Sequence, residues 1–386
     1  MILKNIFSVL HNCLIDLELT KDRISAIGID MAGDFEINFN EAIVFPGLIN
    51  SHDHLDFNLF PRLGNRKYNN YTEWGPDIQL TYASNIDAIL EIPQKVRFEW
   101  GIIKNLLGGI TTVVNHGNKS KEINSPIKII DQFQHLHSVQ FEKFWKLRLN
   151  NPFNKNQFCV IHSGEGIDKE ANEEINELTR YNFLKRKLIA VHGVAMDVEQ
   201  AKSFLGLIWC PQSNEWMFGK TADIEKLKTD VLIAFGTDST LTSDWNIWDH
   251  IRDARETKKL TDFELIHSLT SNAANLWNLN TGIIEVGRIA DLVIAEKKTN
   301  DPMEAFFNVN PQDLLMVISN GEIVLMDENI VNEIAVDNFL NLRLKAITIN
   351  DRVKYIPEDF ISTIKEIQKF PNVSLPCKVV TNAFAY

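Results

Sequence analysis

The chain contains 386 residues, of which 45% are hydrophobic and 23% are charged, and its formal net charge is -12. This composition is typical of a globular protein, and the length allows two domains or one large barrel with an appendage. The acidic balance argues against nucleic-acid binding, which needs clustered Lys and Arg, and no run reaches the ~18 apolar residues of a membrane span. We therefore expect a small-molecule substrate as the partner, with no nucleic acid and no membrane.

The cysteines and the N-terminus indicate the compartment. None of the four cysteines forms a C-x-x-C pair, so we interpret them as reduced thiols rather than as a zinc or redox site. The first 20 residues include Lys4 and Asp16 and lack the sustained apolar segment of a signal peptide. These features predict a cytoplasmic protein.

The first 44 residues are expected to form short strands, because the runs at 2–10, 13–19 and 24–29 are apolar and partly β-branched. From residue 45 the pattern changes to strands alternating with helices, such as the helix expected over 93–107. This alternation predicts a parallel sheet with crossover helices. The expected main domain covers residues 45–284.

Two histidines, His52 and His54, end the first strand of this domain within the stretch VFPGLINSHDHL at 44–55. Residues i and i+2 of a strand point to the same side, so both imidazoles can reach one point in space. Imidazole is the commonest metal-binding side chain. The pair therefore predicts part of a metal site, although an isolated His-x-His motif can also be two polar residues at a strand end.

Three later strands also end in a potential metal ligand: His162, His192 and Asp238. In a (β/α)8 barrel the active site lies at the carboxyl ends of the strands, and one βα unit takes about 31 residues. His162 and His192 are one such unit apart, and His192 and Asp238 are two units apart. If His52 ends strand 1, these residues end strands 5, 6 and 8. The spacing thus predicts that they meet at one rim of a barrel.

A second strand-rich segment is expected at 285–334, with a hairpin turn at Asn320-Gly321. Residues 335–386 are expected to form a helical, apolar tail. The loop at 56–80 follows the first barrel strand and contains Arg62, Lys67 and Trp74. We interpret this loop as a lid over a flat substrate, with a solvated loop as the alternative.

Seven motifs in this order resemble those of the amidohydrolase superfamily of metal-dependent hydrolases, in the branch of cytosine deaminase and of the triazine and adenosylhomocysteine deaminases and chlorohydrolases. They are PGLINSHDHL at 46–55, GGITTVVNHG at 108–117, HSGE at 162–165, VHGVAMD at 191–197, CPQSN at 210–214, FGTDST at 235–240 and GRIADLV at 287–293. The resemblance covers residues 1–330. It implies an α/β fold, a (β/α)8 TIM barrel in which 1–44 and 285–334 pair into a small composite β-sandwich.

The resemblance also implies roles for individual residues. His52, His54, His162 and Asp238 would bind one divalent metal, expected to be zinc with iron as the alternative. Glu165 would be the proton shuttle, and His192 would hold the electrophilic group of the substrate. Three imidazoles and one carboxylate leave a position open for water, whose pKa a divalent cation lowers to about 7.

Some assignments stay open at this stage. His192 is also a candidate second-metal ligand, and so are His116, His135 and His137, although each of these three is more often an ordinary polar residue. The expected substrate-binding residues are Arg62, Trp74, His116, Ser213 and Asn214. A homodimer is compatible with the sequence.

The expected function is hydrolysis of a non-peptide C–N bond, as in the deamination of an aminated heterocycle or a cyclic amidine. The alternatives are hydrolysis of an amide, a cyclic imide or a C–Cl bond at the same site. A non-catalytic scaffold protein of the same fold is the remaining alternative. The retained ligand positions and Glu165 argue against it.

Overall fold

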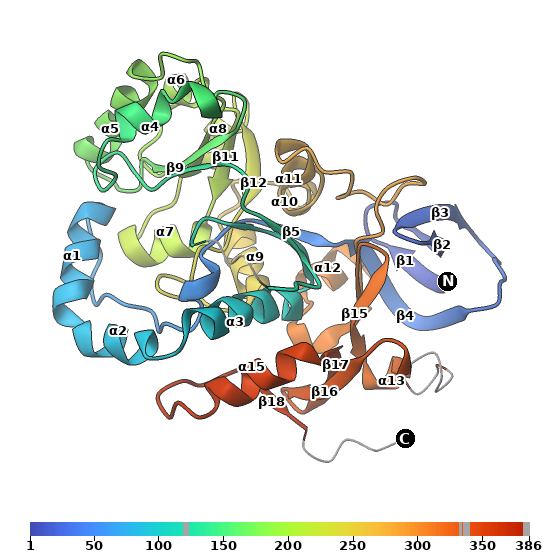
Figure 1. Ribbon diagram of the computed structural model, residues 1–386. Coiled ribbons are helices and arrows are strands. Elements are labelled where there is room, and N and C mark those ends of the chain that lie inside the picture. The colour runs from blue at the N-terminus through green and yellow to red at the C-terminus, as the bar shows by residue number, and fades with distance from the viewer. Residues whose placement is uncertain (119–122, 332–333, 335–339, 381–386) are drawn as a thin grey trace.

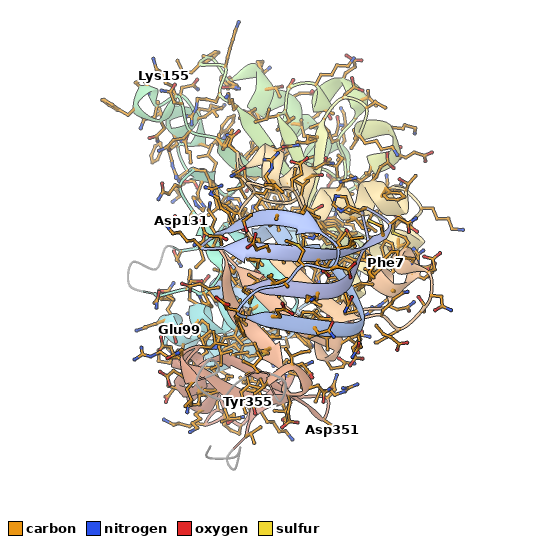
Figure 2. All side chains as sticks on the ribbon, turned by 90° about the vertical axis from the view of Figure 1, so that its right-hand side faces the viewer. Phe7, Glu99, Asp131, Lys155, Asp351 and Tyr355 are labelled. Atoms are coloured by element: carbon orange, nitrogen blue, oxygen red, sulfur yellow. The ribbon has the colours of Figure 1, made fainter. Side chains whose placement is uncertain are left out.

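The computed structural model describes residues 1–118, 123–331, 334 and 340–380. Parallel strands with their helices form one side of the molecule, and the N-terminal strands form the other (Figure 1). The C-terminal segment packs below both parts. Seen from the side of the N-terminal strands, Phe7 lies among these strands, and Asp351 and Tyr355 lie in the C-terminal segment beneath them (Figure 2).

Eight strands follow one another in parallel along the described part of the chain, in two sheets of order β5-β6-β7 and β8-β9-β10-β11-β12. Most of their residues are buried, as in parallel sheets covered on both faces. Their bounds are β5 (Leu48–Asp53), β6 (Ile110–Asn115), β7 (Lys128–Ile130), β8 (Gln134–Leu136), β9 (Cys159–Ser163), β10 (Leu188–His192), β11 (Gly206–Trp209) and β12 (Leu232–Phe235).

The end of β12 returns to the end of β5, because the amides of Thr237 and Asp238 donate to the carbonyl of His52 at 3.1 and 3.0 Å. The expected series of parallel βα units is therefore present. No ladder joins β7 to β8 among the described residues, so a fully closed barrel stays a prediction. The first and last strands of the series nevertheless meet at the residues expected to carry the chemistry.

Helices connect and cover these strands, and side-chain caps set several of their starts. Asp168 caps α5 by accepting from the amide of Ala171, and Asp197 begins α6 in a capping box with Gln200. The helices of this part are η1 (Leu55–Phe57), α1 (Tyr71–Thr81), α2 (Ala83–Leu90), α3 (Gln94–Leu107), α4 (Trp145–Leu149), η2 (Pro152–Asn154), α5 (Lys169–Arg180), α6 (Val198–Ala201), α7 (Pro211–Phe218), α8 (Ile224–Leu227), α9 (Ile247–Glu256), α10 (Asp262–Leu269) and α11 (Ser271–Leu276).

The segment 56–80, expected to be a loop, contains a helix over its last third. Helix α1 begins after Asn70, whose side chain accepts a hydrogen bond from the amide of Glu73. The aromatic residues of this stretch hid the helix, because they do not follow a helical apolar period. Helix α3, in contrast, coincides with the expected helix over 93–107 to within one residue.

The N-terminal and late strands form one ten-stranded sheet of order β18-β16-β17-β15-β14-β13-β4-β1-β2-β3. Strand β4 lies between β1 and β13, and Val44 is paired with Ile294. The two segments expected to form a composite sandwich therefore pair with each other in one sheet, and their packing as a sandwich stays a prediction. Its first strands are β1 (Ile2–Ser8), β2 (Cys13–Thr20), β3 (Arg23–Gly28), β4 (Glu36–Pro46), β13 (Leu292–Glu296), β14 (Leu314–Ser319) and β15 (Glu322–Asp327), with α12 (Pro302–Phe307), η3 (Pro311–Asp313) and α13 (Glu328–Val331) between or after them.

The last part of the chain extends this sheet, although we expected only helices and an apolar tail there. It contains β16 (Leu344–Ile349), β17 (Arg352–Pro357), α15 (Asp359–Ile367) and β18 (Cys377–Val379). The fully buried Lys354 of β17 forms an ion pair with Asp327 of β15 at 2.5 Å and donates to the carbonyl of Leu314 at 2.6 Å. No helix in the described part of the chain is long and apolar enough to cross a membrane.

Candidate metal centre and catalytic site

Four imidazoles converge where β5, β6 and β9 end. His52, His54, His116 and His162 each offer one ring nitrogen, and these nitrogens all lie within 4.8 Å of one another. The Nε2 atoms of His52 and His162 are 3.2 Å apart. Because the carboxyl ends of parallel strands share one edge, residues more than a hundred positions apart in the chain become neighbours here.

Asp238, after β12, brings a carboxylate to the same place. Its Oδ1 lies 3.8 Å from Nε2 of His52 and 3.7 Å from Nε2 of His54. Its Oδ2 accepts hydrogen bonds from Ser213 at 2.8 Å and from Thr242 at 3.0 Å. The structure therefore brings together the four predicted ligands, His52, His54, His162 and Asp238, and adds His116 to them.

The donor set fits a divalent metal. The imidazoles of His52, His116 and His162 are buried, and desolvation together with the neighbouring histidines holds the pKa of each well below its ordinary value. Such rings are neutral and keep a lone pair for a ligand. His162 donates from Nδ1 to the carbonyl of His137 at 2.8 Å, which directs its Nε2 toward His52. Nitrogen-rich sets of this kind suit zinc.

Glu165 and His192 lie beside this cluster. Nε2 of His192 is 3.7 Å from Oε1 of Glu165, and Nδ1 of His192 is 2.8 Å from Oδ1 of Asn214. The Asn214 amide donates in turn to Thr221, so its oxygen faces His192 and the proton of a neutral His192 is on Nδ1. Burial, with the charges of Asp238 and Glu174, raises the pKa of Glu165 well above its ordinary value.

Glu174, on α5, fixes the turn that carries Glu165. Its carboxylate accepts from the amide of Gly164 and from the hydroxyl of Tyr71, both at 2.9 Å. Gly164 has a φ of +65°, which favours glycine. The amide of Tyr71 also donates to the carbonyl of Glu165 at 3.1 Å. Glu174 and Tyr71 thus position Glu165 through hydrogen bonds to the backbone of Gly164 and Glu165, a role that the sequence motif HSGE did not reveal.

The titration of Glu174 predicts a pH-dependent stability. Burial raises its pKa from 4.5 to about 7, so the folded protein keeps a proton that the unfolded chain has lost. The free energy of unfolding should therefore fall as pH rises from about 4.5 to about 7. A Glu174→Gln variant lacks this contribution, and its stability relative to the wild type should increase across the same window. Urea denaturation of both proteins at pH 5 and pH 7.5 measures the difference; an unchanged difference would contradict the prediction.

A cavity of about 110 Å³ opens beside Glu165, His192 and Asp238. Its walls are mostly aromatic and apolar, and they include the predicted substrate-binding residue Trp74. Its lining residues are His54, Phe57, Tyr71, Trp74, His137, Phe141, His162, Glu165, His192, Met217, Asp238, Ser239, Leu241 and Thr242. A second cavity of about 680 Å³ shares His54 and His137 with the first, and it is also lined by His116, His135 and Arg148. The carboxyl ends of the parallel strands therefore border a small reaction cavity and a larger, more polar cavity next to it.

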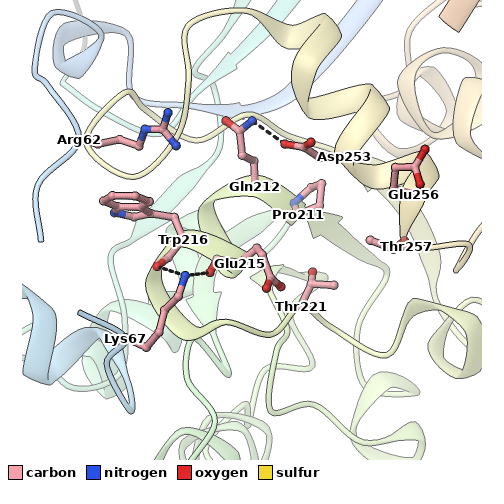
Figure 3. Close-up of a pocket in the computed structure, with 10 residues that line it drawn as sticks. All are labelled: Arg62, Lys67, Pro211, Gln212, Glu215, Trp216, Thr221, Asp253, Glu256 and Thr257. Atoms are coloured by element: carbon pink, nitrogen blue, oxygen red, sulfur yellow. Dashed lines mark hydrogen bonds between the residues drawn. The ribbon is translucent and has the colours of Figure 1, made fainter. Parts of the chain in front are cut away.

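Three predicted substrate-binding residues lie elsewhere. Ser213 and Asn214 are fully buried and contact Asp238 and His192 rather than the cavity. The guanidinium of Arg62 lies 5.0 Å from the ring centre of Trp216 and forms an ion pair with Asp244 at 3.3 Å. Arg62 thereby lines a separate pocket of about 510 Å³, where the Lys67 ammonium is bonded to the carbonyls of Glu215 and Trp216 (Figure 3). The contacts of Arg62 with Trp216 and Asp244 hold its side chain away from the reaction cavity.

A buried ion pair that sequence reasoning missed supports the His52/His54 strand. Lys104 of α3 lies 3.0 Å from Asp53, and both side chains are almost inaccessible to solvent. Asn58 and Asn105 also donate to Asp53, at 2.7 and 2.8 Å. The available signal was Lys104 itself, a charged residue on the apolar face GIIKNLL of a helix. Asp53 is thus fixed at the centre of the His-x-His motif.

Comparison with known proteins agrees with this geometry. The model of the amidohydrolase family matches residues 154–324. A 5-methylthioadenosine/S-adenosylhomocysteine deaminase of Pyrococcus horikoshii is 23% identical over 86% of this chain and 96% of its own length. Among solved structures, an adenosine deaminase from Xanthomonas campestris with bound zinc has a TM-score of 0.67 at 15% identity, covering 89% of this chain and 96% of that one. An atrazine chlorohydrolase from Arthrobacter aurescens, complexed with zinc, has a TM-score of 0.66 at 16% identity, covering 86% and 98%.

The fold and the cluster of metal-binding side chains define a metal-dependent hydrolase. Residues 154–324 match the amidohydrolase family, and most of the chain is similar to deaminases and a chlorohydrolase of the amidohydrolase superfamily.

Proposed function

We propose that this protein deaminates an adenine nucleoside with a modified 5′ position, releasing ammonia from the ring. The observation that carries the proposal is the convergence of Glu165, His192 and Asp238 on one aromatic-walled cavity beside the imidazole cluster. The substrate class is supported by the relatives, which are described as 5-methylthioadenosine/S-adenosylhomocysteine deaminases and 5′-deoxyadenosine deaminases.

His52, His54, His162 and Asp238 would hold the metal, with zinc as the proposed ion. A bound divalent cation supplies Lewis acidity that makes water a nucleophile at neutral pH. Asp238 is suited to this role because Ser213 and Thr242 occupy its Oδ2 and leave Oδ1 facing the histidines. Desolvated imidazoles next to it require no deprotonation before they bind a cation.

Glu165 would move the proton. In the hydrolysis a C–O bond forms at the amino-bearing ring carbon and the C–N bond breaks, so a proton must pass from water to the ring nitrogen and to the leaving amine. Glu165 faces the cavity at 9% side-chain exposure, and its raised pKa suits a carboxyl group that both accepts and returns a proton near neutral pH.

For His192 we propose a role that differs from the one expected from the resemblance. In the role that the resemblance implies, His192 would hold the electrophilic group of the substrate by donating a hydrogen bond to the anion that develops on it. With its proton on Nδ1, held by Asn214, a neutral His192 presents Nε2 as an acceptor. Desolvation lowers its pKa and favours this neutral form. We therefore propose that His192 accepts a hydrogen bond from the substrate amine or from protonated Glu165, and so orients the group that leaves.

An ammonia-release screen tests the function. We expect release from 5′-deoxyadenosine, 5-methylthioadenosine or S-adenosylhomocysteine, with loss of activity after chelation and recovery with added zinc. Cytosine, guanine, a hydantoin and a chlorotriazine serve as comparison substrates. Turnover of one of these, with no ammonia from any adenine nucleoside, would reject the proposed substrate class. A protein that binds no zinc and turns over none of them would instead support the scaffold alternative.

A further inference from the structure

His116 is held against the His-x-His motif by its own backbone. Its amide donates to the carbonyl of Asp53 at 2.8 Å, and Asp53 stands between His52 and His54. The next residue is Gly117, where a side-chain carbon would lie 2.9 Å from Oδ1 of Asp56. A larger residue at 117 would first displace the carboxylate of Asp56. The local structure therefore keeps His116 in direct contact with the motif.

The ring of His116 lies among the other imidazoles. Its centre is 5.1 Å from that of His52, 4.7 Å from that of His162 and 5.7 Å from that of His54. The residue is only 7% exposed, and its Nδ1 is buried without a hydrogen-bond partner among the described residues. An unpaired buried ring nitrogen costs free energy unless a ligand satisfies it. One ring nitrogen of His116 belongs to the cluster, and the ring also bonds to the backbone of Leu136, so an ion held by the cluster is a candidate partner for the nitrogen that remains.

We propose that His116 is a direct ligand of the metal, so that the centre holds four imidazoles and one carboxylate. This inference rests on the metal-dependent function proposed above and extends its ligand set. A substrate contact is the competing role, and it fits less well. His116 lines the larger cavity but not the cavity that contains Glu165 and His192. Four imidazoles also favour zinc and other nitrogen-seeking ions over Mg²⁺ and Mn²⁺.

Metal binding tests this assignment directly. Zinc would be titrated into the full-length apo protein against a competing chromophoric chelator, for the wild type, His116→Ala and His137→Ala. His137 is the matched control, because its ring is also next to His162, at 5.0 Å, yet it lies outside the cluster of four. Its carbonyl, which accepts from His162, survives the substitution. We expect His116→Ala to bind zinc at least about 100-fold more weakly, beyond the usual effect of an indirect partner, and His137→Ala to stay within about 3-fold.

Two further readouts separate a ligand from a structural residue. Added imidazole should restore part of the zinc affinity of His116→Ala, and the visible absorption spectrum of the cobalt-substituted protein should change in this variant but not in His137→Ala. If the apo form of His116→Ala does not fold, His116→Gln is measured in the same way. Zinc affinity within 3-fold of the wild type and an unchanged cobalt spectrum, in a wild type that does bind zinc, would overturn the assignment. A wild type that binds no zinc would instead reject the proposed function.

Discussion

Glu165→Gln is expected to lower kcat by about 10²- to 10⁴-fold, the usual contribution of a positioned acid–base group. Glutamine has nearly the same shape but cannot accept and return a proton. Glu165 is buried beside His192 and Asp238, and the reaction needs a proton carrier at that point. The measurement is the steady-state rate of ammonia release at saturating substrate, together with the zinc content of the variant.

The zinc content should stay at the wild-type value, because Glu165 is not one of the proposed metal ligands, which are the clustered histidines and Asp238. Glu174→Gln provides a matched comparison, since it removes a carboxylate that positions Glu165 without reaching the substrate. Its effect on kcat should be much smaller. A Glu165→Gln protein with at least a tenth of wild-type kcat would contradict the proton-transfer role.

Lys104→Met is expected to reduce the free energy of unfolding by about 3–5 kcal/mol, the range for breaking a buried ion pair at one partner. The variant leaves the carboxylate of Asp53 buried without its cation, and it also removes a donor to Asn58. Urea denaturation of the apo protein measures the loss. Because Asp53 lies between His52 and His54, zinc affinity should fall as well.

The double variant Asp53→Asn/Lys104→Met is the control for this prediction. It removes both charges, so it should be more stable than Lys104→Met alone, and a double-mutant cycle gives the coupling between the two sites. Breaking the second buried ion pair, between Lys354 and Asp327, should cause a similar loss of stability without a change in zinc affinity. A loss below about 1 kcal/mol in Lys104→Met would contradict the prediction.

The sequence predicted the parts of the site that depend on strand ends. His52, His54, His162 and Asp238 each follow a recognisable apolar run, and the common edge of parallel strands brings such residues together. The geometry agrees with that prediction. His116 also follows a strand, but one histidine at a strand end is ambiguous until distances to other ligands are known, and we expected it to contact the substrate.

Other features depend on contacts that no local pattern encodes. The tautomer of His192 follows from Asn214, which is 22 positions away, and the position of Arg62 follows from Asp244, which is 182 positions away. Strands β16 and β17 were missed although β16 contains several apolar residues, because their place in the sheet depends on the pairing of β17 with the earlier strand β15. The same limit applies to Asp53, because its partners Lys104 and Asn105 lie on the distant helix α3.

The place of β4 between β1 and β13 has a consequence for synthesis of the chain. Strands β1 to β4 are complete once residue 46 has been made, yet the partner of β4 on its other edge ends at Glu296. At about 5–20 residues per second, the ribosome needs roughly 12 to 50 s to add the intervening residues. During that interval β4 has an unpaired edge, which is a template for aggregation. Nascent chains stalled shortly before β13 should therefore bind chaperones more strongly than chains stalled after it.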